Sequence, residues 1–165
     1  MIKSLSRTDN EIAEIYSRHV KTIYRICFTY MKNPADTEDI VQETFIKLIR
    51  SAGAFESEEH EKAWLIRTAT NLCKDNLRHW WRKRENLEDY ENTQGKEQIQ
   101  LDETLEAVMS LPEKYKTVVY LYYYDGYTSV EIARILAKPQ STIRNYLHEA
   151  RNILRIKLGS DLNEE

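Results

Sequence analysis

Residues 127–157 read as a short amphipathic helix, a tight turn and a longer helix, and this pattern restricts the possible folds strongly. The longer helix carries an apolar stripe at helical spacing, formed by Ile143, Leu147, Ala150 and Leu154. A basic row repeats the same spacing one residue later, at Arg144, His148, Arg151 and Arg155. Such a segment is typical of a helix-turn-helix, whose second helix enters the major groove of DNA.

The composition favours an all-α protein. Of the 165 residues, 31% are charged and 41% are hydrophobic, glycine and proline are scarce, and no segment alternates as a strand does. No apolar run is long enough to span a membrane. Cys27 and Cys73 fall within helical patterns, so we expect two reduced, buried thiols. The sequence contains no CxxC pair, so it does not predict a cysteine-ligated zinc site. No cofactor is expected.

The charge distribution divides the chain into two small helical domains joined by an acidic linker. Residues 1–84 hold 15 Lys and Arg against 12 Asp and Glu, whereas residues 85–103 hold one against seven. The linker is therefore placed at 85–100, and the second domain at 101–165. Local basic patches remain on both sides of the linker, so the net charge of −3 does not exclude a nucleic-acid partner.

Helical periodicity predicts three helices in the first domain, over residues 10–31, 37–51 and 62–84. The first ends at Asn33-Pro34, because proline disfavours a helical conformation in the preceding residue. Asp36 is the expected N-cap of the second helix. Residues 52–61 are polar and contain a glycine, and they are predicted to form a loop.

The second domain is predicted to contain four helices, over residues 101–110, 113–124, 128–136 and 141–157. Asp125-Gly126 ends the second of them. Thr128 and Glu131 have the spacing of a capping box, which marks the start of the helix-turn-helix.

Two blocks of motifs point to one family. The first block is DTEDIVQETFIKL at 36–48, then Phe55, then KAWLIRTATNLCKDNLR at 62–78. The second block is LPEKYKTVVYL at 111–121, DGYTSVEIA at 125–133 and STIRNYLHEAR at 141–151. With these blocks in this order, the chain resembles the two-domain, extracytoplasmic-function group of bacterial RNA polymerase sigma factors.

The resemblance implies that the second helix docks on the clamp helices of the polymerase β′ subunit. The positions that match the docking segment are Asp39, Gln42, Glu43, Phe45, Ile46 and Lys47. Without the resemblance, an acidic helix face is most often a solvated one.

The resemblance also implies that the 52–61 loop and the third helix read the minus-ten element as a single strand. A base flips out of the strand at a cost of a few kcal/mol, which the protein must return as stacking and hydrogen bonds. The matching positions are Phe55, Trp64, Arg67, Asn71, Lys74, Asp75 and Arg78. Packing of Trp64 on a neighbouring helix is the alternative.

The helix-turn-helix would read the minus-thirty-five element as duplex. The positions that match the base readers are Ser141, Thr142, Arg144, Asn145 and His148. Arg151 and Arg155 would contact phosphate, as would the helix N-terminus at Thr128.

The chain departs from the family pattern at several positions. Ala137 stands where the turn usually has glycine, so a non-glycine residue must adopt the turn geometry. Tyr146 and Glu149 replace frequent arginines, and the predicted minus-ten loop holds four acids, Glu56, Glu58, Glu59 and Glu61.

The expected partners are core RNA polymerase (its β′ clamp helices and β subunit), promoter DNA and an anti-sigma factor, all met in the cytoplasm. Neither a small-molecule substrate nor catalysis is expected, because the four histidines have no ligand spacing and no nucleophile has a recognisable partner. The alternative function is a dimeric helix-turn-helix regulator that binds palindromic operators.

Overall fold

The computed structural model describes residues 7–51, 53–84 and 102–162. These residues form helices and contain no β-strand, which confirms the all-α prediction. The chain divides into two compact units on either side of the boundary between Ile99 and Gln100. The predicted acidic linker, 85–100, lies outside the described residues.

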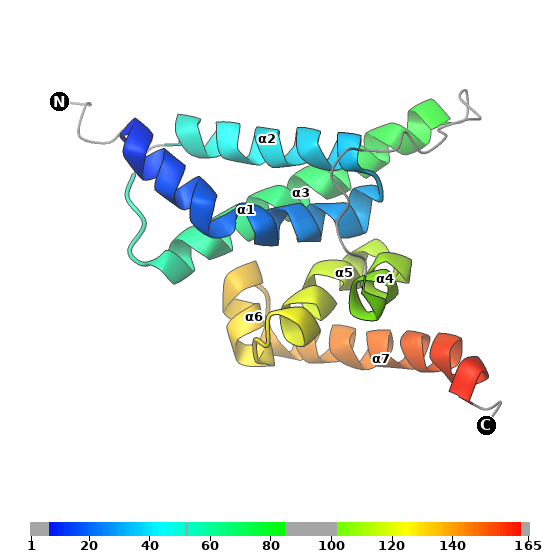
Figure 1. The fold of residues 1–165 in the computed structure, drawn as a ribbon. Coiled ribbons are helices and arrows are strands. Elements are labelled where there is room, and N and C mark those ends of the chain that lie inside the picture. The colour runs from blue at the N-terminus through cyan, green and yellow to red at the C-terminus, as the bar shows by residue number, and fades with distance from the viewer. Residues whose placement is uncertain (1–6, 52, 85–101, 163–165) are drawn as a thin grey trace. The chain divides into compact units, whose positions relative to one another are not determined.

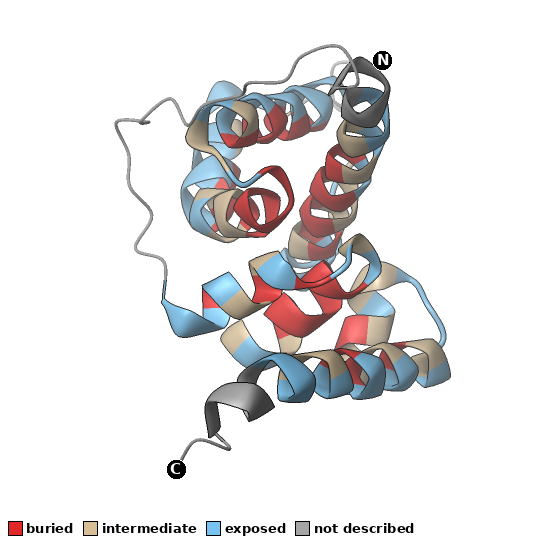
Figure 2. Cartoon of the chain, turned by 90° about the vertical axis from the view of Figure 1, so that its right-hand side faces the viewer, coloured by how far each residue is buried: buried red, intermediate tan, exposed pale blue. Residues whose placement is uncertain are grey.

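The first unit packs α1 (Asp9–Met31), α2 (Pro34–Arg50) and α3 (Glu58–Arg84) so that each helix contacts the other two (Figure 1). The buried side of each helix faces the other two (Figure 2). Fully buried apolar residues come from all three helices and include Ile23, Ile26, Leu48, Leu65 and Ile66. Burial of each such side chain contributes about 1.5–3 kcal/mol relative to leaving it exposed.

The second helix begins earlier than predicted, and its N-cap is a different residue. The side chain of Asn33 accepts a hydrogen bond from the backbone N–H of Asp36 at 2.9 Å, and Pro34 occupies the first turn. Proline is well suited to this position, because its missing N–H has no partner within the helix there. The prediction of Asp36 as N-cap is therefore wrong, and Asp36 is the acidic residue of the first turn.

The third helix begins at Glu58, so the predicted loop over 52–61 is too long. Ser57 precedes the helix, and its hydroxyl accepts a hydrogen bond from the backbone N–H of His60 at 3.1 Å. Three of the four acids that the sequence analysis placed in the loop lie in the first turn of α3, namely Glu58, Glu59 and Glu61. Negative side chains are favourable at a helix N-terminus.

The second unit contains α4 (Glu103–Ser110), α5 (Glu113–Val119), η2 (Tyr120–Tyr124), α6 (Ser129–Leu136) and α7 (Gln140–Leu162). The long helix α7 contacts both α5 and α6 (Figure 1). The core between these elements is formed by fully buried residues that include Leu105, Leu121, Ile132 and Ile143.

The tyrosine run at the end of the predicted 113–124 helix adopts π-helical geometry rather than continuing the α-helix. The backbone N–H of Asp125 donates to the carbonyl of Tyr120, five residues back, at 3.3 Å. In this wider turn Tyr120 is fully buried, whereas Tyr123 is 47% exposed. Gly126 then reverses the chain with a φ of +75°, a conformation that glycine adopts at little cost.

Candidate nucleic-acid interface

Helix α7 separates an apolar side from a polar one. Its predicted stripe lies in the core, with Ile143, Leu147 and Ala150 buried and Leu154 half-buried. Most predicted DNA contacts of this helix are exposed on the other side, at Ser141, Arg144, Asn145, His148, Arg151 and Arg155. Thr142 is half-buried. The helix therefore offers a row of hydrogen-bond donors and cations to a groove while it remains anchored in the unit.

In the turn before α7, a non-glycine residue adopts the turn geometry, as the sequence requires. Ala137 adopts left-handed backbone angles, φ 53° and ψ 47°. The N–H of Lys138 donates to the carbonyl of Ala133 at 3.0 Å, and the N–H of Ala137 donates to that of Arg134 at 3.3 Å. These two bonds form a Schellman motif, which usually has glycine at the left-handed position. Alanine therefore holds a conformation that costs a residue with a Cβ about 1–2 kcal/mol.

The start of α6 is closed by the predicted capping box. The hydroxyl of Thr128 accepts from the N–H of Glu131 at 3.2 Å, and the Glu131 carboxylate accepts from the N–H of Thr128 at 3.0 Å. These hydrogen bonds lower the pKa of Glu131. A DNA phosphate at this helix end would share the first turn with a carboxylate. The predicted phosphate contact at Thr128 therefore depends on the N–H groups of Ser129 and Val130, which the box does not use.

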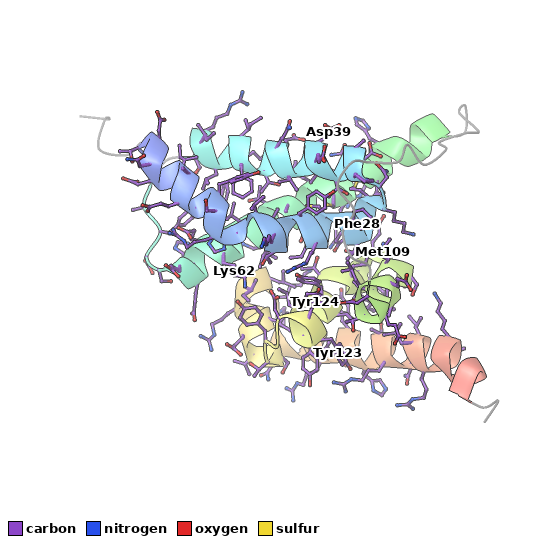
Figure 3. The ribbon with its side chains drawn as sticks, viewed as in Figure 1. Phe28, Asp39, Lys62, Met109, Tyr123 and Tyr124 are labelled. Carbon is purple, nitrogen blue, oxygen red and sulfur yellow. The ribbon has the colours of Figure 1, made fainter. Side chains whose placement is uncertain are left out.

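Arg151 is held by two tyrosines that the sequence analysis did not select. Its Nε donates to the hydroxyl of Tyr123 at 2.8 Å, and its guanidinium lies 5.5 Å from the ring centroid of Tyr122. The hydrogen bond with Tyr123 raises the pKa of Arg151. The side chain of Tyr123 extends from η2 beside α7 (Figure 3). The π-helical turn orients these tyrosines, and the sequence carried no signal for it beyond the aromatic run.

Glu149 interacts with α5, which accounts for an acid at this position of α7. Its carboxylate accepts a hydrogen bond from the hydroxyl of Tyr115 and lies 4.0 Å from the ammonium of Lys114. The bond with Glu149 raises the pKa of Tyr115. Tyr146, the other departure from arginine, packs edge-on against Tyr115 with the ring centroids 5.6 Å apart. Both residues therefore link α7 to α5.

In the first unit, the predicted minus-ten residues lie along α3 and in the loop before it. Phe55 and Trp64 are half-buried, and their ring centroids are 6.0 Å apart. Of the polar positions on α3, Asn71, Asp75 and Arg78 are exposed. Arg67 and Lys74 are half-buried. Trp64 therefore packs partly on Phe55 of the loop, while the predicted stacking role of Trp64 stays a prediction.

Glu61 does not belong to a surface that could lie on DNA. Its side chain is buried between α1 and α3, where Arg18 Nη2 donates to Oε1 at 2.9 Å. The Nε2 atom of His19 lies 2.6 Å from Oε2 of the same carboxylate. Glu56, Glu58 and Glu59 are exposed. The acidity of this region is thus reduced by one internally neutralised group.

The predicted docking face of α2 is exposed at five of its six positions. Asp39, Gln42, Glu43, Ile46 and Lys47 face solvent, and Figure 3 marks Asp39 on this face. Phe45 is buried, with its ring 4.8 Å from that of Tyr16, so it supports the face from below. Ile49 is 52% exposed beside Ile46, which is 42% exposed. Ile49 extends the face. The sequence could have indicated this, because a residue three positions after Ile46 lies on the same side of a helix.

Two family models match successive parts of the chain. The family model of Sigma-70 region 2 matches residues 15–84, and that of Sigma-70 region 4 matches residues 101–154. The ECF RNA polymerase sigma factor SigW of Bacillus subtilis is 30% identical over 95% of this chain and 94% of its own length. The chain belongs to the extracytoplasmic-function family of RNA polymerase sigma factors. The RNA polymerase sigma factor SigV of the same organism is 32% identical over 87% of this chain and 88% of its own.

Solved structures share the fold of this sigma factor. The sigma factor RpoE of Bartonella quintana, in a co-crystal with the anti-sigma factor NepR, aligns with a TM-score of 0.66 at 18% identity. The alignment covers 92% of this chain and 98% of the RpoE chain. CnrH, in complex with the cytosolic domain of CnrY, aligns with a TM-score of 0.65 over 93% of this chain and 91% of its own.

Family membership confirms the predicted sigma factor and disfavours the dimeric operator-binding regulator. Within the described parts of the sigma factor, no His, Cys, Asp and Glu side chains cluster in a way that would hold a metal ion. None of the described helices is long and apolar enough to cross a membrane.

Proposed function

We propose that this sigma factor docks on core RNA polymerase through α2, reads the upstream promoter element with α7, and captures the minus-ten strand with α3 and the 51–57 loop. The observation that carries the proposal is the two-sided character of α7. Its buried stripe fixes the helix in the second unit, and its exposed row has the side-chain chemistry of a major-groove reader.

The upstream reading is divided between bases and phosphates. Arg144 and Asn145 are exposed in the first two turns of α7, where side chains of a recognition helix reach base edges. Arginine binds guanine through two hydrogen bonds and asparagine binds adenine likewise, each worth about 1–3 kcal/mol of discrimination. Arg151 and Arg155 lie farther along the helix and contact phosphates.

The minus-ten reading captures a single strand. Opening unstacks bases at a cost of a few kcal/mol, and the half-buried rings of Phe55 and Trp64 can return part of it by stacking. Asn71 is exposed on α3 and presents an amide to a base edge, while Arg78 is exposed farther along for phosphate. The chain needs no catalytic group for this role, because it traps a strand that thermal motion exposes.

The proposal extends to partners and place. Core polymerase meets the exposed face of α2 through its β′ clamp helices, with further contacts on its β subunit, in the cytoplasm. An anti-sigma factor restrains the free protein. The first aligned structure supports this last point, since it holds the sigma factor RpoE in a complex with the anti-sigma factor NepR.

Two variants test whether α7 reads the upstream element and α3 captures the minus-ten strand. Each is assayed with core polymerase on a promoter selected from a genomic template pool. Arg144→Ala should change the preferred upstream sequence and leave opening at the minus-ten region intact. Asn71→Ala should slow opening and leave upstream preference intact. Each variant is the control for the other, and Arg144→Lys separates charge from two-pronged hydrogen bonding. If both alanine variants lose only their affinity for core polymerase, this assignment of roles to α7 and α3 is wrong.

A further inference from the structure

Arg7 forms hydrogen bonds to the loop that leads into α3, although it lies far from that loop in sequence. Its Nη1 donates to the carbonyl oxygens of Leu48 and Ser51, each at 3.0 Å, and to the Ser51 hydroxyl at 2.9 Å. Its Nη2 donates to the carbonyl oxygen of Gly53 at 2.7 Å. One guanidinium thus joins the C-terminal end of α2 to the middle of the loop.

The same guanidinium orients the aromatic residue at the loop's end. Its central carbon lies 4.6 Å from the ring centroid of Phe55, within the range of a cation–π contact. The His60 ring lies edge-on to the Phe55 ring, with the centroids 5.3 Å apart, and the Trp64 ring is tilted against it, with the centroids 6.0 Å apart. Arginine suits this position because its planar fork can stack on a ring and donate several hydrogen bonds at once.

Arg7 directly precedes the N-cap of α1. The next residue, Thr8, is the N-cap of α1, and its hydroxyl accepts from the N–H of Glu11 at 3.2 Å. The cation also lies at the C-terminal end of α2, where the helix dipole favours positive charge. The capped helix start and the field at the end of α2 therefore both favour this position of the guanidinium in the free protein.

Close apolar packing does not support the loop on this side. A cavity of about 510 Å³ separates the start of α1 from the loop, and Arg7, Gly53 and Phe55 all line it. Gly53 has a φ of +103°, so the loop contains a residue with wide conformational freedom. Without the Arg7 side chain, Leu48, Ser51 and Gly53 would lose their hydrogen bonds to it and with them this bridge to the start of α1.

We propose that Arg7 is a positioning residue of the minus-ten reader, which holds the 51–57 loop and the Phe55 ring in the geometry that receives the displaced strand. Arg7 precedes the segment matched by the Sigma-70 region 2 model, residues 15–84. The inference rests on the proposed function, because Phe55 must contact the strand for its orientation to matter.

The test measures promoter binding and opening separately, with the full chain in complex with core polymerase. Opening is followed by permanganate reactivity of minus-ten thymines, well below the unfolding temperature. Arg7→Ala should open about tenfold more slowly, with the affinity of the initial, unopened complex unchanged. Arg7→Lys should fall between, because it keeps the charge and loses the fork. Lys21→Ala, which removes an exposed cation from α1, is the control and should open at the wild-type rate.

A double-mutant cycle distinguishes positioning through Phe55 from general support of the fold. If Arg7 acts through Phe55, Arg7→Ala combined with Phe55→Ala should open no more slowly than Phe55→Ala alone. Wild-type opening by Arg7→Ala, or effects that multiply in the double variant, would overturn the inference and leave the proposed function standing. Normal opening by Phe55→Ala would instead remove Phe55 from the reader, and the inference with it. If Arg7→Ala does not fold, the opening rate of Arg7→Lys tests the inference instead. Slower opening by Arg7→Lys supports the inference, and opening at the wild-type rate overturns it.

Discussion

The Nε2 atom of His19 lies 2.6 Å from the Oε2 atom of Glu61, and this buried pair joins α1 to the first turn of α3. Arg18 completes the cluster with hydrogen bonds from Nε and Nη2 to the same carboxylate, at 2.9–3.2 Å. The cluster holds the start of α3 against α1 directly after the 51–57 loop. It therefore stabilises the part of the first unit on which the proposed minus-ten reader depends.

Glu61 should make the first unit sensitive to acid. Burial raises the pKa of Glu61, but the hydrogen bonds from Arg18 and His19 outweigh burial, so the pKa lies below its ordinary value. A depressed pKa contributes stability above the unfolded-state pKa, about 4.3, and this contribution is lost as the pH falls through the folded-state pKa. Urea unfolding measured between pH 7 and 3 should show the loss, and Glu61→Gln should weaken the pH dependence in that window.

The same substitution should destabilise the protein at neutral pH. Glu61→Gln removes the buried carboxylate to which Arg18 donates, while the exposed Glu58 carboxylate stays 3.9 Å from the Nε of Arg18. It also turns an amide N–H₂ toward the guanidinium, so we expect a loss of about 2 kcal/mol. Glu59→Gln removes an exposed acid from the same turn and should change stability by less than about 0.5 kcal/mol. Equal effects of the two substitutions would show that the buried cluster contributes no more than an exposed charge.

Ala137→Gly should stabilise the second unit. The left-handed conformation at Ala137 costs alanine about 1–2 kcal/mol, whereas the extra freedom of glycine in the unfolded chain costs about 0.5–1 kcal/mol. We expect a net gain of about 0.5–1 kcal/mol in the free energy of unfolding. Ala133→Gly, within α6, is the matched control and should destabilise by a similar amount. A loss of stability in Ala137→Gly would contradict the turn geometry.

Tyr123 should pre-organise Arg151 for phosphate contact. Arg151→Ala should weaken duplex binding by the full chain and reduce its salt dependence by about one counterion. Tyr123→Phe removes the 2.8 Å hydrogen bond but no charge, so it should weaken binding about two- to fivefold with the salt dependence retained. Fluorescence anisotropy across a salt series measures both quantities. An unchanged salt dependence in Arg151→Ala would remove Arg151 from the phosphate contacts.

The two cysteines should be unreactive in the folded protein. Both thiols are fully buried, and a hydrogen bond with Cys73, together with burial, raises the pKa of Cys27 well above its usual range. Because the thiolate is the reactive form, Ellman's reagent at pH 8 should label neither thiol in buffer and both in denaturant. Rapid labelling of either cysteine in buffer would contradict their burial between α1 and α3.

Periodicity was enough to predict the helices, because each buries a continuous apolar stripe. The boundaries depended on which polar residue captures the first free N–H groups, and periodicity does not decide that. At α2 both Asn33 and Asp36 could cap, and Pro34 decides for Asn33 because it belongs in the first turn. At α3 the polar residues and the glycine suggested a loop, although three of the acidic residues lie in a helix start that favours negative charge.

The candidate site was predictable as far as it consists of exposed residues on one helix. Side chains that reach across the fold were not predictable. Arg7 contacts the loop 44 residues beyond it at Ser51, and Tyr123 contacts Arg151 28 residues away. Sequence spacing says nothing about such pairs until the tertiary fold brings them together. Phe45 matches the docking motif and lies in the core, so the motif alone did not show that it would support the exposed face from below.

The most direct test of the central claim is run-off transcription by the purified chain and core RNA polymerase on a genomic template pool. The proposed function predicts a one-to-one complex that initiates on a subset of templates sharing an upstream element. Initiation should decrease when the exposed α2 face is altered by Asp39→Arg. A chain that neither binds core polymerase nor directs initiation on any template would contradict the proposal.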